Sequence, residues 1–166
     1  MRYYVDTSVL VTYYHEPSQP EAAWLEEFVG IHAGEGSLLL SRLTILEYSA
    51  WLLARRRRPR NDPQYLKPRR LRAALERLEH DVSQVGVFGR FDTDGGRAWI
   101  DRALQVIHEH RQRRIEVCDA LHLAAALPHP GEIGMLTRDR AMRDVCDECR
   151  IHAPRAPGSV LVGSLR

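Results

Sequence analysis

Short runs of apolar residues alternate with longer segments of helical periodicity along the chain. The apolar runs predict buried strands at residues 2–5, 37–41, 82–88 and 133–136, with a further edge strand at 151–153. Between them, apolar residues recur at every third or fourth position, which is typical of amphipathic helices. Strands that alternate with helices predict an α/β fold. We expect three α/β/α layers around a mostly parallel, twisted sheet of four to five strands.

The predicted helices are bounded by prolines, glycines and capping residues. They lie at about residues 8–14, 21–32, 43–54, 71–78, 100–107, 117–127 and 139–149. Two of them carry an apolar stripe that we expect to be buried: Leu43, Leu46, Ala50 and Leu53 in one, and Ile100, Ala103, Leu104 and Ile107 in the other. The helix from residue 117 is almost wholly apolar, which indicates a buried position.

The composition is that of one ordinary globular domain. The chain has 166 residues, of which 44% are apolar and 28% are charged. We expect a single domain at 1–154, with an arginine-rich insert at about 55–68 and a tail at 155–166. Three cysteines form no disulfide framework, which fits a reducing compartment. With no signal sequence and no apolar run long enough to cross a bilayer, we expect a cytoplasmic protein without a membrane contact.

The charge is distributed unevenly. Residues 55–72 hold nine basic side chains and one acidic one, whereas the rest of the chain holds 15 basic and 21 acidic residues. A concentrated cationic segment on an acidic body is what a polyanion-binding protein needs. A solvated, arginine-rich loop or helix face is the simpler interpretation, and the pattern alone favours neither.

Four carboxylates occupy positions where the hydrophobic pattern predicts an apolar or structurally neutral residue. Asp6 ends the first strand and Asp139 follows the fourth, and ligands bind beyond the carboxyl ends of parallel strands. Glu47 falls on or beside the apolar stripe of its helix. Asp119 lies near the start of the most apolar helix. These four residues are therefore candidates for one shared site.

Each carboxylate taken alone has a structural explanation. Asp6 and Asp139 could be helix N-caps, Asp119 could accept hydrogen bonds from first-turn amides, and Glu47 could pair with an arginine. A buried carboxylate is costly unless it is paired or metal-bound. The presence of all four, two of them at strand ends, favours a common cation site over four separate explanations.

Four segments of the chain carry a family resemblance: YYVDTSVL, SRLTILEYSAWL, VCDALHLAAAL and GMLTRDRAM. They resemble the signature blocks of PIN-domain proteins, most closely the VapC-type toxins of toxin–antitoxin pairs. The resemblance covers nearly the whole chain, apart from the arginine-rich insert at 55–60 and the tail after Pro154. It implies a PIN-like, doubly wound parallel sheet, a divalent-ion nuclease site and RNA as the substrate. It also implies a dedicated antitoxin protein and a homodimer.

The ligand preferences of divalent cations suggest a role for each carboxylate. Oxygen ligands favour Mg²⁺ or Mn²⁺ over zinc, and Mg²⁺ takes only one or two carboxylates directly. We expect Asp6 and Asp119 to be metal ligands, with Glu47 and Asp139 completing the catalytic pocket. The hydroxyls of two further residues are placed to support these carboxylates or the substrate phosphate: Ser8 and Thr137. Together with the family resemblance, which implies RNA as the substrate and a toxin role, the chain is predicted to be a Mg²⁺- or Mn²⁺-dependent endoribonuclease, the toxin of a toxin–antitoxin pair.

Five arginines of the insert are candidates to hold RNA phosphates, with Trp51 and Tyr65 nearby for stacking: Arg55, Arg56, Arg57, Arg58 and Arg60. An acidic segment of the antitoxin could use the same surface. The pair Cys146 and Cys149 lacks the second ligand pair of a zinc site. His122 is interpreted as a hydrogen-bonded core histidine.

Three other functions are weaker. A catalytically inactive PIN-fold module that binds RNA or docks a protein is the main alternative. A magnesium phosphatase would need a second aspartate two residues after Asp6, where Ser8 stands. DNA binding in a regulatory complex would need a partner for sequence readout, because no helix-turn-helix is evident.

Overall fold

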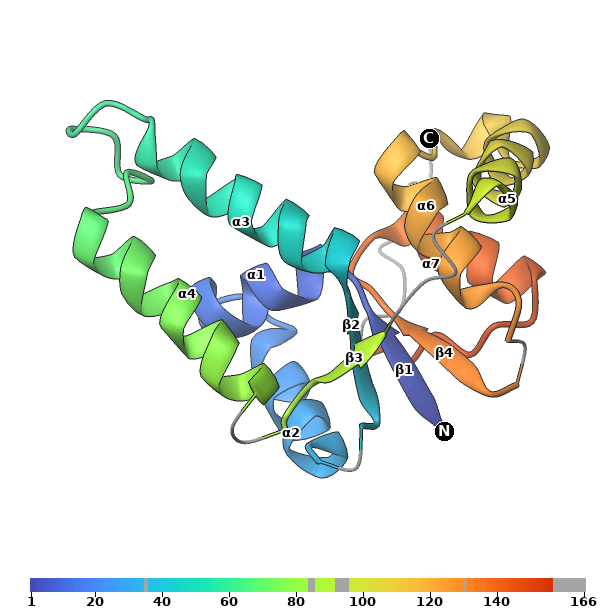
Figure 1. Ribbon diagram of the computed structural model, residues 1–166, viewed down its shortest axis with the longest axis horizontal. Helices are drawn as coiled ribbons and strands as arrows, with labels where there is room; N and C mark the ends of the chain where they lie inside the picture. The colour runs from blue at the N-terminus through green and yellow to red at the C-terminus, as the bar shows by residue number, and fades with distance from the viewer. Residues whose placement is uncertain (35, 84–85, 92–95, 130, 157–166) are drawn as a thin grey trace.

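The computed structural model describes residues 1–34, 36–83, 86–91, 96–129 and 131–156. Its sheet has four parallel strands in the order β3-β2-β1-β4, which confirms the predicted fold class (Figure 1). The strands are β1 (Arg2–Val5), β2 (Leu38–Ser41), β3 (Gly89–Phe91) and β4 (Ile133–Leu136). Strand β1 therefore lies inside the sheet, between β2 and β4. Most of the predicted tail, from residue 157 on, lies outside the described residues.

Two strand predictions need correction. The third strand was expected at 82–88, but Val82 and Ser83 end a helix and β3 begins at Gly89. Val82 packs against the core from that helix, so its apolar character signals helix packing instead of a strand. Residues 151–153 form no strand, although the His152 carbonyl accepts a hydrogen bond of 2.8 Å from the Met135 amide of β4.

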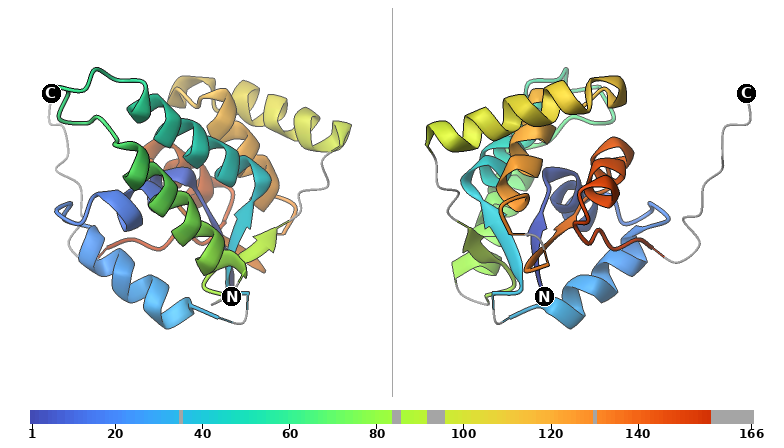
Figure 2. Two further views of the ribbon diagram at one scale, coloured as in Figure 1. Left: turned by 60° about the vertical axis from the view of Figure 1, so that its left-hand side comes forward. Right: turned by 90° about the vertical axis from the view of Figure 1, so that its right-hand side faces the viewer.

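Seven α-helices and a short 3-10 helix cover the two faces of this sheet in the described part of the chain. One face packs against α1 (Thr7–His15), α2 (Ala22–His32), α3 (Arg42–Arg56) and α4 (Pro68–Ser83). The other packs against α5 (Arg97–Glu109), α6 (Val117–Ala126) and α7 (Arg140–Glu148), with the 3-10 helix at Arg111–Arg113. Side chains of β1 alternate between the two cores, and the two layers of helices are visible on either side of the strands (Figure 2).

Helices α3 and α4 form a hairpin that extends away from the sheet (Figure 1). The predicted buried face of α3 is wrong. Leu46 is 67% exposed and Leu53 is 46% exposed, whereas Thr44, Tyr48 and Leu52 are fully buried. Helix α3 is apolar on two stripes, and contacts with the sheet and α1 decide which stripe is buried. The inward face of α5 is shifted in the same way, toward Ala103 and Val106.

Among the described residues, no helix combines the length and the apolar character that a membrane span requires.

Candidate metal centre

Asp6 lies at the carboxyl end of the central strand, where topology predicted a site. It is only 5% exposed. Its Oδ2 accepts hydrogen bonds from the Ser8 hydroxyl at 2.5 Å and from the Thr137 hydroxyl at 2.8 Å. Ser8 belongs to the first turn of α1 and Thr137 follows β4, so both predicted supporting hydroxyls contact Asp6. Three neighbouring segments therefore fix the orientation of one carboxylate.

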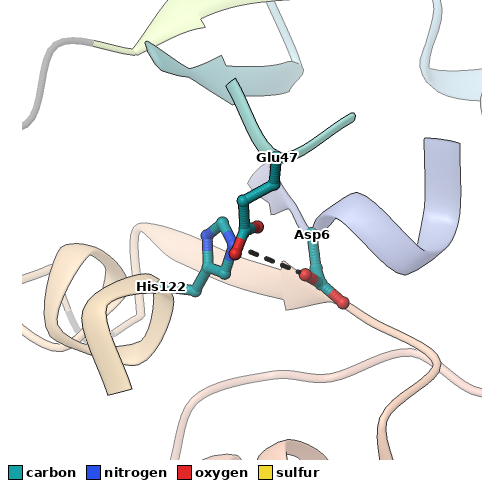
Figure 3. A group of neighbouring side chains, drawn as sticks. All are labelled: Asp6, Glu47 and His122. Atoms are coloured by element: carbon teal, nitrogen blue, oxygen red, sulfur yellow. Dashed lines mark hydrogen bonds and ion pairs between the residues drawn. The ribbon is translucent and has the colours of Figure 1, made fainter. Parts of the chain in front are cut away.

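Glu47 and His122 meet Asp6 from opposite layers of helices (Figure 3). Glu47 comes from α3 and His122 from α6. The Nε2 atom of His122 lies 2.6 Å from Glu47 Oε2 and 3.6 Å from Asp6 Oδ1. The hydroxyl of Thr7 donates to the same Glu47 oxygen at 2.6 Å. One ligand atom of each of the three residues lies within 4.8 Å of the other two, which is the spacing of a cation site.

A chain of buried hydroxyls holds the other edge of His122. The Thr44 hydroxyl donates its only proton to the carbonyl of Val5 at 3.0 Å. The Thr44 oxygen can therefore only accept from the Ser41 hydroxyl, which lies 3.1 Å away. The Ser41 oxygen, 2.6 Å from the Tyr4 hydroxyl, then accepts from Tyr4.

Tyr4 is thereby left to accept from His122 Nδ1, at 2.8 Å. On the other edge of the ring, Nε2 lies 2.6 Å from Glu47 Oε2. Hydrogen-bond partners on both ring nitrogens therefore fix the plane of His122 from both sides. Burial raises the pKa of Tyr4 to about 12, so its hydroxyl stays neutral.

Glu47 is ionised throughout the ordinary pH range. Burial by itself would raise its pKa, but hydrogen bonds from His122 and Thr7 outweigh burial and hold the pKa at about 2. The hydrogen bond to Glu47, together with burial, raises the pKa of the neighbouring Cys118 thiol to about 11. Cys118 is therefore present as a thiol and not as a reactive thiolate.

Asp119 and Asp139 stand at the margin of this group. Asp119 accepts a hydrogen bond of 3.1 Å from the Glu116 amide, as part of a capping box at the start of α6. Asp139 is the N-cap of α7, where it accepts from the Met142 amide at 2.9 Å. Both residues therefore make the helix-capping hydrogen bonds that were one of the two explanations offered by the sequence. Neither belongs to the three-residue group around Asp6.

The charges of these acids nevertheless act on one another. Burial, reinforced by the charges of Asp139 and Asp6, raises the pKa of Asp119 above its ordinary value. No ion pair in the described part of the chain joins an arginine to Asp6, Glu47, Asp119 or Asp139. The negative potential at the strand ends is therefore not cancelled by arginines. The structure differs from the sequence-based assignment in that Glu47, and not Asp119, adjoins Asp6.

His122 was given no functional role from the sequence. It is buried and hydrogen-bonded, as a core histidine should be, yet it also contacts the two carboxylates. The signal was available: His122 is a titratable residue inside the most apolar helix, three positions after Asp119. In a helix this spacing places two residues on one face, so the acid and the imidazole are on the same side of α6.

The donor set fits a hard divalent cation. Two carboxylates held by hydrogen bonds supply oxygen ligands, and an imidazole nitrogen lies beside them. Carboxylate oxygens suit Mg²⁺ and Mn²⁺, whereas the sulfur ligands common in structural zinc sites do not contribute here.

The parallel sheet, with Asp6 and Glu47 grouped at its carboxyl edge, fits a metal-dependent nuclease fold of the PIN type. The chain matches the family model of the PIN domain over residues 3–148 and belongs to that family. Its fold is similar to that of PAE2754 from Pyrobaculum aerophilum, with a TM-score of 0.51, 20% identity, and coverage of 86% of this chain and 82% of that chain. No curated protein sequence matches the chain.

Proposed function

We propose that this protein is a Mg²⁺- or Mn²⁺-dependent endoribonuclease that hydrolyses RNA phosphodiester bonds. The observation that carries the proposal is the convergence of Asp6, Glu47 and His122 at the carboxyl edge of the sheet, with both carboxylates ionised or held by hydrogen bonds. A bound divalent ion would supply Lewis acidity and lower the pKa of a bound water. Asp6 and Glu47 are the residues that would hold it.

The surrounding residues have separate roles in this proposal. Ser8 and Thr137 keep the Asp6 carboxylate in place, and His122 and Thr7 do the same for Glu47. Positions fixed in advance reduce the reorganisation needed at the moment of reaction. Burial raises the pKa of Asp119, which borders the centre from the start of α6. Asp139 adds negative charge at that edge.

We also propose that the enzyme is the toxin of a cytoplasmic toxin–antitoxin pair and that a cognate antitoxin protein inhibits it. The support is the resemblance of the four sequence blocks to VapC-type toxins. Its three cysteines are free thiols, as a reducing cytoplasm would keep them.

A homodimer is proposed from the resemblance to VapC-type toxins. Exposed apolar side chains on α3, α5 and the start of α6 are candidates for its interface: Leu46, Leu53, Ile100, Leu104 and Val117. Sedimentation equilibrium of the purified protein measures the oligomeric state directly. A monomer at all concentrations would remove this part of the proposal.

The nuclease proposal is tested by the substitution Asp6→Asn, which keeps the size of the side chain and removes its charge. We expect RNA cleavage with Mg²⁺ or Mn²⁺ to fall by at least roughly a hundredfold, since one electrostatic contact to the reacting centre is lost. Cleavage of labelled RNA is measured with and without chelator.

The matched control is Asp101→Asn, because Asp101 lies on the surface of α5 in an ion pair with Arg97. It should cleave like the unaltered protein. Cleavage by a folded D6N variant at the normal rate would contradict the site. Absence of cleavage by the unaltered protein at every metal concentration would instead favour the inactive PIN-fold module.

A further inference from the structure

Apart from the metal centre, a pocket lies between the end of the α3–α4 hairpin and the end of α1. Its volume is about 510 Å³, within the range of small-ligand sites. The linker from 57 to 67 closes one side, and it is folded back so that the Leu66 amide donates to the Arg55 carbonyl at 3.2 Å. The pocket is thus built from three helices and an ordered turn.

The side chains that line this pocket are basic and aromatic. Arg55, Arg70 and Arg77 contribute guanidinium groups, and Tyr14 and Tyr65 contribute rings. No aspartate or glutamate is among the lining residues. Such a combination is suited to a ligand that has both a phosphate and a planar ring.

The arginines of the basic segment divide into two groups. Arg56 donates to the Tyr65 hydroxyl at 2.7 Å and Arg58 pairs with Asp62 at 3.0 Å, so these two stabilise the linker. Arg55 and Arg70 make no side-chain hydrogen bond or ion pair with the part of the chain that the structure describes. Their donors remain available, and both line the pocket.

The pocket is organised before any ligand arrives. The guanidinium of Arg55 lies over the Trp51 ring at 4.1 Å, and that of Arg77 lies over Tyr14 at 4.9 Å. Arg77 also pairs with Asp81 at 4.0 Å, whereas Arg55, held by its flat face, keeps its N–H edges free for a phosphate. Burial, and then the charge of Arg55, lower the pKa of the neighbouring His15, and the charge of Glu16 acts in the opposite direction.

We propose that this pocket binds one nucleotide of single-stranded RNA, with the phosphate on Arg55, Arg70 and Arg77 and the base against the tyrosine rings. The proposal rests on the proposed ribonuclease function for the identity of the polymer. Helix α3 carries Glu47 of the metal centre and Arg55 of the pocket eight residues apart, which is about 12 Å along a helix. A single strand is long enough to reach both, so the pocket would position RNA for cleavage.

The test measures RNA binding separately from cleavage. A fluorescent RNA of about 12 nucleotides is titrated with the protein in chelator, and anisotropy gives the dissociation constant at several salt concentrations. Arg70→Ala should weaken binding about fivefold at 0.1 M salt and lower the salt slope by about 0.7, the value of one single-strand phosphate contact. Arg72→Ala is the matched control, since Arg72 is exposed on the same helix and does not line the pocket.

Competitors identify what the pocket binds. A nucleoside 5′-monophosphate should displace the RNA from the unaltered protein better than inorganic phosphate does, because the tyrosine rings add stacking. Equal effects of R70A and R72A would overturn the proposal. Displacement by a poly-glutamate peptide but not by the mononucleotide would assign the pocket to an acidic protein segment instead. Because chelator stops metal-dependent cleavage, a failure of the nuclease proposal does not affect this result.

Discussion

The metal centre and the basic pocket hold opposite charges by different means. At the metal centre, the carboxylates of Asp6 and Glu47 are fixed by hydroxyl and imidazole donors and are largely withdrawn from solvent. In the basic pocket, Arg55 and Arg77 rest on aromatic faces, and Arg55 keeps its donors free. The carboxylates of the first region are thus held in place by contacts within the chain. In the second region, Arg55 and Arg70 keep donors for a ligand.

The two regions also differ in how the chain builds them. Asp6 and Thr137 are 131 residues apart and meet only because β1 and β4 are neighbours in the sheet. Most of the basic pocket comes from one hairpin, between Arg55 and Arg77, with the end of α1 alongside. Long-range topology therefore defines the metal centre, whereas local helix packing defines the pocket. Helix α3 is the element that contributes to both.

The largest expected effect comes from loosening this shared helix. Leu52→Ala should reduce the free energy of unfolding by about 3 kcal/mol, because Leu52 is fully buried and the substitution leaves a cavity. Leu53→Ala, at the next position, should cost less than about 1 kcal/mol, since Leu53 is 46% exposed. Urea denaturation measures both. Equal losses would mean that the face of α3 assigned as buried is incorrect.

A smaller effect should be confined to the metal centre. Tyr4→Phe removes the hydroxyl that joins His122 to Ser41 and leaves both without that partner. We expect a loss of about 1 to 2 kcal/mol in stability and reduced cleavage, with RNA binding in chelator unchanged.

Tyr3→Phe, on the same strand, is the control for this change. The Tyr3 hydroxyl makes no hydrogen bond with the described residues, so its loss should alter neither stability nor cleavage. If Y4F behaved like Y3F, the hydroxyl chain would have no role in holding His122.

A further effect concerns acid stability. The pKa of Glu47 is about 2 in the folded chain, below the ordinary value of 4.5. Such a group stabilises the fold above its unfolded pKa, and the contribution is lost as the pH falls toward the folded pKa. Urea denaturation between about pH 6 and pH 3 should therefore show the stability difference between the unaltered protein and E47Q shrinking as the pH falls. A difference that does not depend on pH would contradict the assigned ionisation.

Sequence patterns predicted most of the fold because strand and helix periods differ clearly. The apolar runs at 2–5 and 133–136 form β1 and β4 with the predicted bounds. Asp6 lies at the carboxyl end of β1, as the topology of a parallel sheet predicts. The third strand was missed because β3 has only three residues, two of them Gly89 and Arg90. Neither residue carries the apolar signature that identifies a buried strand.

The site was harder to predict because helix rotation decides which side chains meet. The stripe of Leu46 and Leu53 looked more apolar than the one with Thr44 and Tyr48, yet the second is buried. Hydroxyls are buried there because each finds a partner, as Thr44 does at the Val5 carbonyl. The partners lie far away in the sequence, so the pattern within one helix cannot show them. For the same reason the contact between His122 and Glu47 was not foreseen.

The position of β1 inside the sheet has a consequence for synthesis of the protein. The first strand to leave the ribosome must wait for β4, the last, before its second edge is paired. His122 and Thr137 also arrive late, so Asp6 remains without these partners until nearly the whole domain has emerged. A nascent chain consequently lacks the assembled acidic centre until β4 pairs with β1.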